Sequence, residues 1–209
     1  RQRGAKPLAM GDLDRAGMGG DFGACDLFPM GQQPRHRKAA AFAGGPHALR
    51  AVQSYNAFCT SQWFADQGFA VVVTDGRGTP GRGSVWERAV HLDLATAPLE
   101  DQVDALHAAA EEFPLDLTRV AIRGWSFGGY LAALAVIRRP DVFHAAVAGA
   151  PVTEWRLYDT HYTERYLGDP TVDAVPYAAT SLLPLADELT RPLLLVHGLA
   201  DDNVVAAHT

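Results

Sequence analysis

The chain has 209 residues, of which 48% are hydrophobic and 20% charged, so it can form one folded domain with a sizeable core. Acidic residues outnumber basic ones by 24 to 18, and this net charge of −6 argues against a nucleic-acid-binding protein. No hydrophobic run reaches the roughly 18 residues that a membrane span requires, and two cysteines are too few for a disulfide framework or a four-ligand zinc site.

The first 38 residues differ from the rest in charge and pattern. They carry seven basic and four acidic side chains, and 10 of them are glycine or proline. No helical or strand period can be defended there, and nothing in this stretch is typical of a sheet strand. We therefore expect residues 1–38 to be an irregular or linker segment, and residues 39–209 to form the folded domain.

After this segment, strands and helices begin to alternate. Lys38–Ala43 is a weak strand candidate, and a helix over about 52–67 is expected to end at Gly68. The run Phe69–Thr74 (FAVVVT) is hydrophobic throughout, as in a strand that is buried on both faces. A long glycine-rich loop, residues 75–83, follows it.

The alternation continues through the second half of the chain. A helix is expected to begin near Pro98, with Glu100 and Asp101 at its positive end. Three short strands follow, at Arg119–Arg123, Ala145–Ala150 and Pro192–His197. A hydrophobic helix, Phe127–Arg138, lies between the first two. Hydrophobic strands that alternate with helices predict a mostly parallel α/β sheet with helices on both faces.

The sharpest motif is Gly124-Trp125-Ser126-Phe127-Gly128, which fits G-x-S-x-G. It lies between an expected strand and an expected helix, where the chain must reverse sharply and small flanking residues avoid clashes. Such a turn holds the serine hydroxyl clear of the sheet edge, and the backbone N–H of Phe127 then points to where an acyl oxyanion forms. The alternative is a chance string in a chain with 20 glycines, but the context favours a nucleophile.

A serine nucleophile needs a base, and in this arrangement an acid and then a histidine follow it along the chain. Asp201 and Asp202 follow the strand Pro192–His197. Composition does not choose between them, and both also suit a turn or a helix N-cap. Of eight histidines, only His208 comes after them, in what reads as the next helix. We therefore expect the base beyond Thr209, after a final strand.

Three stretches together resemble the prolyl oligopeptidase family, most closely its dipeptidyl peptidase IV branch. They are residues 124–130 (GWSFGGY), 150–166 (APVTEWRLYDTHYTERY) and 197–204 (HGLADDNV). The similarity runs from about residue 43 to residue 209. It implies a partial α/β-hydrolase catalytic domain, incomplete at both ends, with a β-propeller domain before it in the intact protein.

The resemblance also implies an activity and assigns roles. The protein is expected to be a serine peptidase that cleaves peptides after proline or alanine, without a cofactor or metal. Ser126 is then the nucleophile, Asp201 rather than Asp202 the triad acid, and the Phe127 amide one oxyanion donor. In this branch the second donor is a tyrosine hydroxyl, and the matching position here is Ala43. That donor is therefore missing or supplied differently.

A small hydrophobic pocket for the proline or alanine is implied as well. Its matching residues are Val152, Trp155, Tyr158 and Tyr162, with Asn203 and Val204 at further wall and carbonyl-binding positions. Independently of the resemblance, positions 155, 158 and 162 fall on one face of an expected helix. The alternative is that this aromatic stripe is simply core.

Other functions stay open at this point. An esterase or acyl-peptide hydrolase would use the same triad, and a non-catalytic homologue would fit Ala43 and the missing histidine. The glycine-rich loop resembles a phosphate loop only superficially, and no His/Cys/Asp cluster has metal-ligand spacing. A peptide substrate is the expected partner, and a homo-oligomer stays open. The first residues show no signal-peptide pattern, but in a partial chain this says little about localisation, and the cytoplasm is only slightly favoured.

Overall fold

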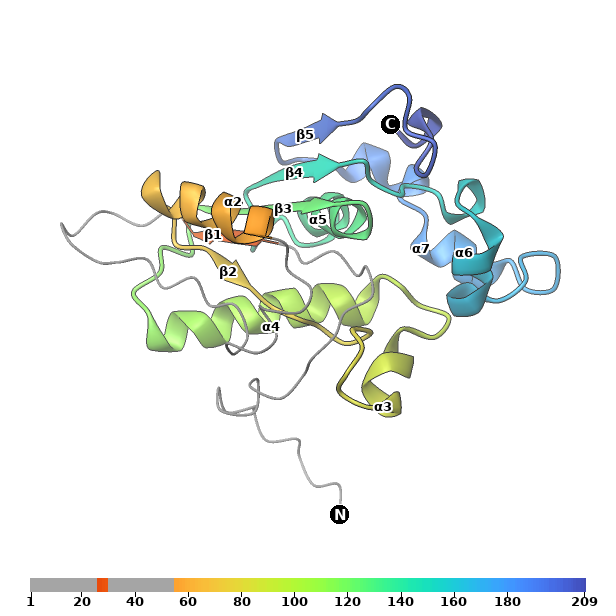
Figure 1. Ribbon diagram of the computed structural model, residues 1–209, viewed down its shortest axis with the longest axis horizontal. Coiled ribbons are helices and arrows are strands. Elements are labelled where there is room, and N and C mark those ends of the chain that lie inside the picture. Colours follow the sequence, from red (N-terminus) through yellow and green to blue (C-terminus); the bar gives the residue numbers. More distant parts are fainter. Residues whose placement is uncertain (1–25, 30–54) are drawn as a thin grey trace, which may run out of the picture.

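A single five-stranded sheet, in the order β2-β1-β3-β4-β5, organises the molecule (Figure 1). The computed structural model describes residues 26–29 and 55–209. Both the strand candidate Lys38–Ala43 and Ala43 as an oxyanion position lie outside these residues.

The parallel part of the sheet comes from the second half of the chain. β3 (Val120–Trp125), β4 (Ala145–Gly149) and β5 (Leu193–Val196) pair in parallel as neighbours. Between β3 and β4 the chain forms the hydrophobic helix α5 (Phe127–Arg138). The predicted strands of this half and the predicted helix are confirmed, with strand ends shifted by one or two residues.

The first strand of the sheet was not expected. β1 (Asp26–Pro29) lies between β2 (Val72–Val73) and β3, and it is antiparallel to both. The prediction that residues 1–38 contain no strand is therefore wrong at these residues. The mostly parallel sheet expected from the sequence therefore contains one antiparallel strand, which separates β2 from β3. β1 has only two hydrophobic residues between Asp26 and Pro29, too few for a recognisable strand period.

The helices and turns around the sheet are short except for α2, α4 and α5. Their bounds are α2 Tyr55–Asp66, α3 Ser84–Glu87, η2 Arg88–Val90, α4 Thr96–Glu112, η3 Trp155–Leu157, α6 Thr160–Leu167, α7 Val175–Thr180, η4 Leu183–Glu188 and η5 Ala206–His208, where η marks a 3₁₀ helix. No helix in the described part of the chain is both long and hydrophobic enough to cross a lipid bilayer.

The two faces of the sheet are covered by different helices. In β3, Val120 and Ile122 are buried on the face that packs against α5. Arg123 points to the opposite face, because successive side chains alternate along a strand. There its guanidinium lies 5.2 Å from the ring centre of Phe64 in α2. The prediction of helices on both faces is therefore confirmed.

Helix α5 is the centre of the core. Every residue from Phe127 to Ile137 is buried, as expected for a helix that is hydrophobic on all sides. A Cβ atom added at Gly129 would lie 2.3 Å from the carbonyl oxygen of Gly149, so α5 packs directly on the backbone of β4. The hydroxyl of Tyr130 donates to the carbonyl of Thr180 at 3.0 Å, and burial raises the pKa of this hydroxyl.

An ion pair fixes the glycine-rich loop to the start of α4. Arg77 Nε donates to Asp101 Oδ1 at 2.8 Å, and the backbone N–H of Arg77 donates to the other carboxylate oxygen. The hydrogen bond to Asp101 raises the pKa of the Arg77 guanidinium. Trp86 Nε1 also donates to the carbonyl of Gly76 at 3.0 Å. These contacts are those of a structural loop.

Replacing Gly129 with alanine is expected to destabilise the protein by about 2 kcal/mol or more. The added Cβ would press against the backbone of β4, and the clash outweighs the higher helix propensity of alanine. Equilibrium urea unfolding measures the change. Gly198→Ala is the control, because its Cβ would meet atoms only at 4.0 Å. Equal unfolding midpoints for the two variants would contradict this packing.

Replacing Asp101 with alanine is expected to lower the free energy of unfolding by about 2 kcal/mol, since charged hydrogen bonds to Arg77 are lost. The neighbouring variant Glu100→Ala removes only an exposed ion pair to the same guanidinium, which is worth at most about 1 kcal/mol. The two variants can be compared by thermal or urea unfolding. A larger loss for Glu100→Ala than for Asp101→Ala would be incompatible with the described geometry.

Candidate active site

Ser126 lies in a sharp turn between β3 and α5. Its φ is 56°, a value that residues with a Cβ rarely adopt and that only a constraining environment maintains. Its backbone N–H donates to the carbonyl of Gly149 at 2.9 Å, and its carbonyl accepts from the N–H of Tyr130 at 2.9 Å. The neighbouring strand and the first helical turn thus hold the serine backbone on both sides.

Two glycines near Ser126 lie where an added Cβ would clash with neighbouring atoms. A Cβ at Gly124 would lie 2.1 Å from the carbonyl oxygen of Gly128. A Cβ at Gly149 would lie 2.0 Å from the ring of Trp125. Gly124 and Gly128, the two glycines of the motif, therefore lie in direct contact. This contact gives the G-x-S-x-G spacing a physical reason.

Phe127 is the first residue of α5, so its amide lies at the positive end of the helix dipole, directly after Ser126. Its side chain points into the core, where the ring centre lies 6.1 Å from that of Trp155. The ring therefore connects this turn to the aromatic residues described below.

Asp201 shapes the loop that follows β5. Its Oδ1 accepts hydrogen bonds from the backbone N–H groups of Asn203 at 3.0 Å and Val204 at 2.9 Å. Both hydrogen bonds lower the pKa of the Asp201 carboxyl, and the bond from Val204 has the larger effect. The carboxylate is therefore ionised at neutral pH and protonates only below the usual range of an aspartate. Asp202 is exposed.

The sheet brings Ser126 and Asp201 to the same edge. Both residues follow parallel strands, β3 and β5, and only β4 lies between these. The carboxyl ends of parallel strands meet at one edge of a sheet. Two strand spacings correspond to about 10 Å, and this separation leaves room for an imidazole between a serine and an aspartate.

The two histidines near Asp201 are bonded within the loop. His197 Nε2 donates to the carbonyl of Val204 at 2.7 Å and lies 3.8 Å from Asp201 Oδ2. His208 is buried, and its Nδ1 accepts from the backbone N–H of Glu154 at 3.5 Å. Burial lowers the pKa of His208. Both rings therefore hold local structure.

The three aromatic residues of the expected pocket do not share one helix. Trp155 lies in η3, and at Tyr158 the backbone is extended, with φ −95° and ψ 166°. Asp159 then caps α6 by accepting from the N–H of Tyr162 at 2.8 Å. The prediction of one helical face is therefore wrong, because a capping aspartate starts a new helix between these residues.

The rings nevertheless meet in space. Trp155 and Tyr162 stack with ring centres 6.1 Å apart, and Tyr158 meets both rings edge-on. The hydroxyl of Tyr158 donates to Asn203 Oδ1 at 3.2 Å, which connects this cluster to the Asp201 loop.

Burial divides the expected pocket residues into two groups. Val152, Trp155 and Val204 are 1% exposed and belong to the hydrophobic core, as the core interpretation anticipates. Tyr158 and Tyr162 are half-buried, and Asn203 is exposed. Sequence reasoning did not assign Thr153, Glu154 or His197 to this region, since their roles depend on backbone contacts that carry no sequence signal. Across residues 26–29 and 55–209, no three histidine, cysteine or acidic side chains gather as a metal site would need.

Comparison with known proteins agrees with this geometry. The model of the prolyl oligopeptidase family matches residues 55–209. Dipeptidyl peptidase 8 of Homo sapiens is 44% identical over 149 residues, which cover 69% of this chain and 17% of that protein. Prolyl endopeptidase FAP of Homo sapiens is 36% identical over 166 residues, which cover 77% of this chain and 22% of that protein.

A solved structure shows the same similarity. The crystal structure of Porphyromonas gingivalis dipeptidyl peptidase 4 matches with a TM-score of 0.66 and 38% identity, over 71% of this chain and 21% of that one. The chain therefore spans about a fifth of the length of these relatives. With its α/β-hydrolase fold and a family match over most of its length, the chain belongs to the prolyl oligopeptidase family of serine peptidases, in the dipeptidyl peptidase IV-like branch.

Proposed function

We propose that the protein containing this chain hydrolyses peptides after proline or alanine, with Ser126 as the nucleophile. The observation that carries the proposal is the turn at Ser126. A residue with a Cβ is held at positive φ, at the N-terminus of a buried helix and at the same sheet edge as Asp201. Strained backbone of this kind concentrates at functional sites.

The proposed reaction is acyl transfer in two steps. Ser126 Oγ attacks the scissile carbonyl carbon, and its proton passes to an imidazole that Asp201 orients and stabilises as a cation. The Phe127 N–H donates to the oxyanion that forms. The imidazolium then gives its proton to the leaving amine, and water repeats the sequence to release the acyl group. The lowered pKa of Asp201 keeps it ionised throughout.

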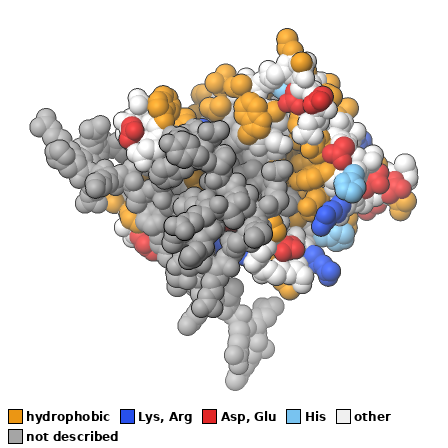
Figure 2. Space-filling view, viewed as in Figure 1, with side chains coloured by type: hydrophobic (Ala, Val, Ile, Leu, Met, Phe, Trp, Pro, Cys, Tyr) orange, Lys and Arg blue, Asp and Glu red, His pale blue; other side chains and the backbone are white. Residues whose placement is uncertain are grey.

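The base is proposed to be a histidine beyond Thr209, after a strand that pairs with β5. Two features support this assignment. His208 is buried and bonded to Glu154, so it is unsuited to shuttling protons. In β5, the edge strand of the sheet, the side chains of Leu194, Leu195 and Val196 are exposed. Figure 2 shows hydrophobic side chains gathered on this side of the molecule. An exposed hydrophobic edge strand is ordinarily paired or covered in a native protein.

The proposed substrate class follows from relatives and from the aromatic cluster. The related proteins are named dipeptidyl peptidase and prolyl endopeptidase, and a proline ring fits aromatic surfaces. Tyr158 and Tyr162 present half-buried faces beside Trp155, so the substrate's proline or alanine is proposed to contact them. Val152, Asn203 and Val204 are proposed to complete this site. We also propose that a β-propeller domain precedes the catalytic domain in the intact protein.

Labelling with a fluorophosphonate tests the activated serine in the whole protein. We expect Ser126→Ala to abolish labelling and to lower turnover of a Gly-Pro or Ala-Pro chromogenic amide about 10⁶-fold. Asp201→Asn is expected to lower turnover about 10⁴-fold. Asp202→Asn is the matched control and should leave turnover within about threefold, because removing one exposed charge changes little.

The outcomes separate the alternatives. If Ser126 is labelled and the protein hydrolyses an ester or an acyl-peptide but not the amide, the activity is that of an esterase or acyl-peptide hydrolase rather than the proposed peptidase. An unlabelled wild-type protein would indicate a non-catalytic homologue. A larger loss for Asp202→Asn than for Asp201→Asn would reverse the assignment of the acid.

Residues 1–209 alone are expected to hydrolyse none of these amides above background. Loss of the triad base costs about 10⁶ in turnover, because the members act as a unit. The assay compares purified residues 1–209 with the same polypeptide carrying Ser126→Ala. If residues 1–209 hydrolyse the amide and Ser126→Ala abolishes this activity, the proposed placement of the base beyond Thr209 is wrong. One of the histidines within the chain would then have to act as the base.

A further inference from the structure

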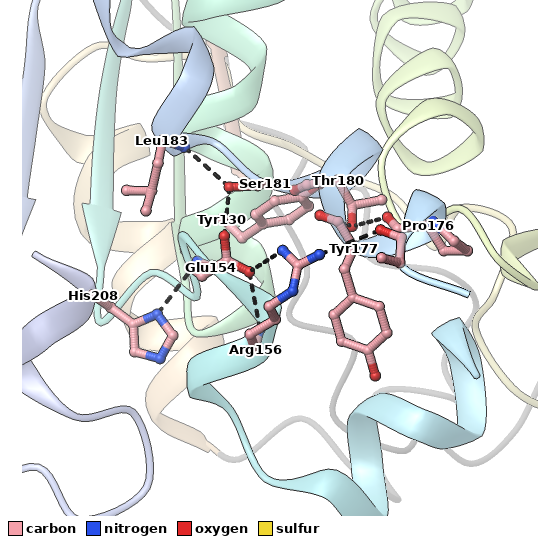
Figure 3. Close-up of polar contacts among 10 residues, drawn as sticks. Tyr130, Glu154, Arg156, Pro176, Tyr177, Thr180, Ser181, Leu183 and His208 are labelled. Atoms are coloured by element: carbon pink, nitrogen blue, oxygen red, sulfur yellow. Dashed lines mark hydrogen bonds and ion pairs between the residues drawn. The ribbon is translucent and has the colours of Figure 1, made fainter. Parts of the chain in front are cut away.

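A partly buried polar cluster joins η5 to the segment that carries Trp155 (Figure 3). His208 is 3% exposed, and its Nδ1 accepts a hydrogen bond from the backbone N–H of Glu154. The backbone carbonyl of His208 accepts another from Thr153 Oγ1 at 2.7 Å. One residue in the loop after Asp201 therefore binds the two residues that precede Trp155.

The carboxylate of Glu154 extends this cluster. Its Oε2 accepts from the hydroxyl of Ser181 at 2.8 Å, and its Oε1 accepts from the backbone N–H of Arg156 at 3.1 Å. Figure 3 shows this carboxylate between the Ser181 hydroxyl and the Arg156 guanidinium. Arg156 also donates to the carbonyl of Ala174 at 3.3 Å. The residues on both sides of Trp155 are thus held by hydrogen bonds.

The other end of the connection is equally constrained. His197, at the end of β5, contacts the carbonyl of Val204 and the hydroxyl of Thr209. These two residues flank His208 in the chain, and Asp201 binds the backbone N–H of Val204. The loop from Asp201 to Thr209 is therefore fixed to β5, and His208 is its contact with the Trp155 segment.

The protonation of His208 follows from its contact. Since Nδ1 accepts a hydrogen bond, the neutral ring carries its proton on Nε2. Burial is the largest influence on this group and lowers its pKa, so the ring is neutral at pH 7. The backbone N–H of Glu154 therefore needs only one acceptor atom from this side chain, at the Nδ1 position.

We propose that His208 is a positioning residue for the peptidase reaction. Through Glu154 it fixes Trp155 relative to the Asp201 loop and to Ser126, and thereby determines how tightly the substrate's proline is held. Trp155 contacts the ring of Phe127, the residue after Ser126. The Ser126 backbone is held separately by hydrogen bonds with Gly149 and Tyr130, so a shift of Trp155 changes the contact with the substrate's proline more than the nucleophile. This inference rests on the proposed function.

The test compares two amide substitutions in the whole protein. Asparagine places its side-chain oxygen near the position of Nδ1 and can accept the Glu154 N–H, whereas glutamine places its amide near Nε2. We expect His208→Gln to raise KM for an Ala-Pro amide about tenfold, as the loss of one hydrogen bond would, while kcat changes less. His208→Asn is expected to retain the wild-type KM. Labelling by a small fluorophosphonate, which lacks a proline, should proceed equally in both variants.

A second variant guards against a folding defect. Thr153→Val removes the neighbouring hydrogen bond to the His208 carbonyl and keeps the shape of the side chain, so it is expected to raise KM in the same direction. A wild-type protein that is neither labelled nor active would overturn the proposed function, and this inference with it. A labelled, active wild type whose KM is unchanged by Thr153→Val and by folded His208→Gln would overturn the positioning role alone. Equal impairment by His208→Asn and His208→Gln would do the same.

Discussion

The direct contact between α5 and the backbone of the sheet is the constraint on which the rest of the structure depends. Gly129 allows the helix to touch β4, and Gly124 allows β3 to touch the carbonyl of Gly128. With no side chains at these positions, the chain reverses within one residue after β3. That reversal holds Ser126 at positive φ and at the N-terminus of a buried helix. The proposed chemistry uses both consequences, a half-buried serine beyond the end of β3 and an adjacent helix amide.

The order of the parallel strands then determines which other residues meet the serine. Because β4 lies between β3 and β5, the loop after β5 reaches the same edge of the sheet about two strand spacings away. The same loop contacts the segment that carries the aromatic cluster twice, through Asn203 with Tyr158 and through His208 with Glu154. Segments about fifty residues apart in the sequence are thus joined into one unit beside Ser126.

Sequence reasoning succeeded where a local pattern carries the information. Phe127–Arg138 was predicted at its observed bounds, because a continuous hydrophobic helix follows a glycine-flanked serine and precedes Pro140. It failed where tertiary pairing decides. β1 is a strand because two neighbours supply hydrogen-bond partners, although its own four residues carry no period.

The candidate site shows the same division between local and tertiary information. The motif marks Ser126, and order along the chain marks the aspartate pair after β5, whereas only the family resemblance singles out Asp201. The break in helical structure at Tyr158 depends on whether Asp159 caps a new helix, and sequence alone leaves this open. The contact between His208 and Glu154 uses a backbone N–H, which every residue but proline possesses. No residue pattern marks such a partner.

A crystal structure of the whole protein with a phosphonate bound to Ser126 tests the central claim most directly. The account predicts a phosphonyl oxygen about 3 Å from the backbone N–H of Phe127, and an imidazole that contacts both Ser126 Oγ and the Asp201 carboxylate. An unmodified Ser126, or an imidazole bound to Asp202 with Asp201 directed away from it, would contradict the account.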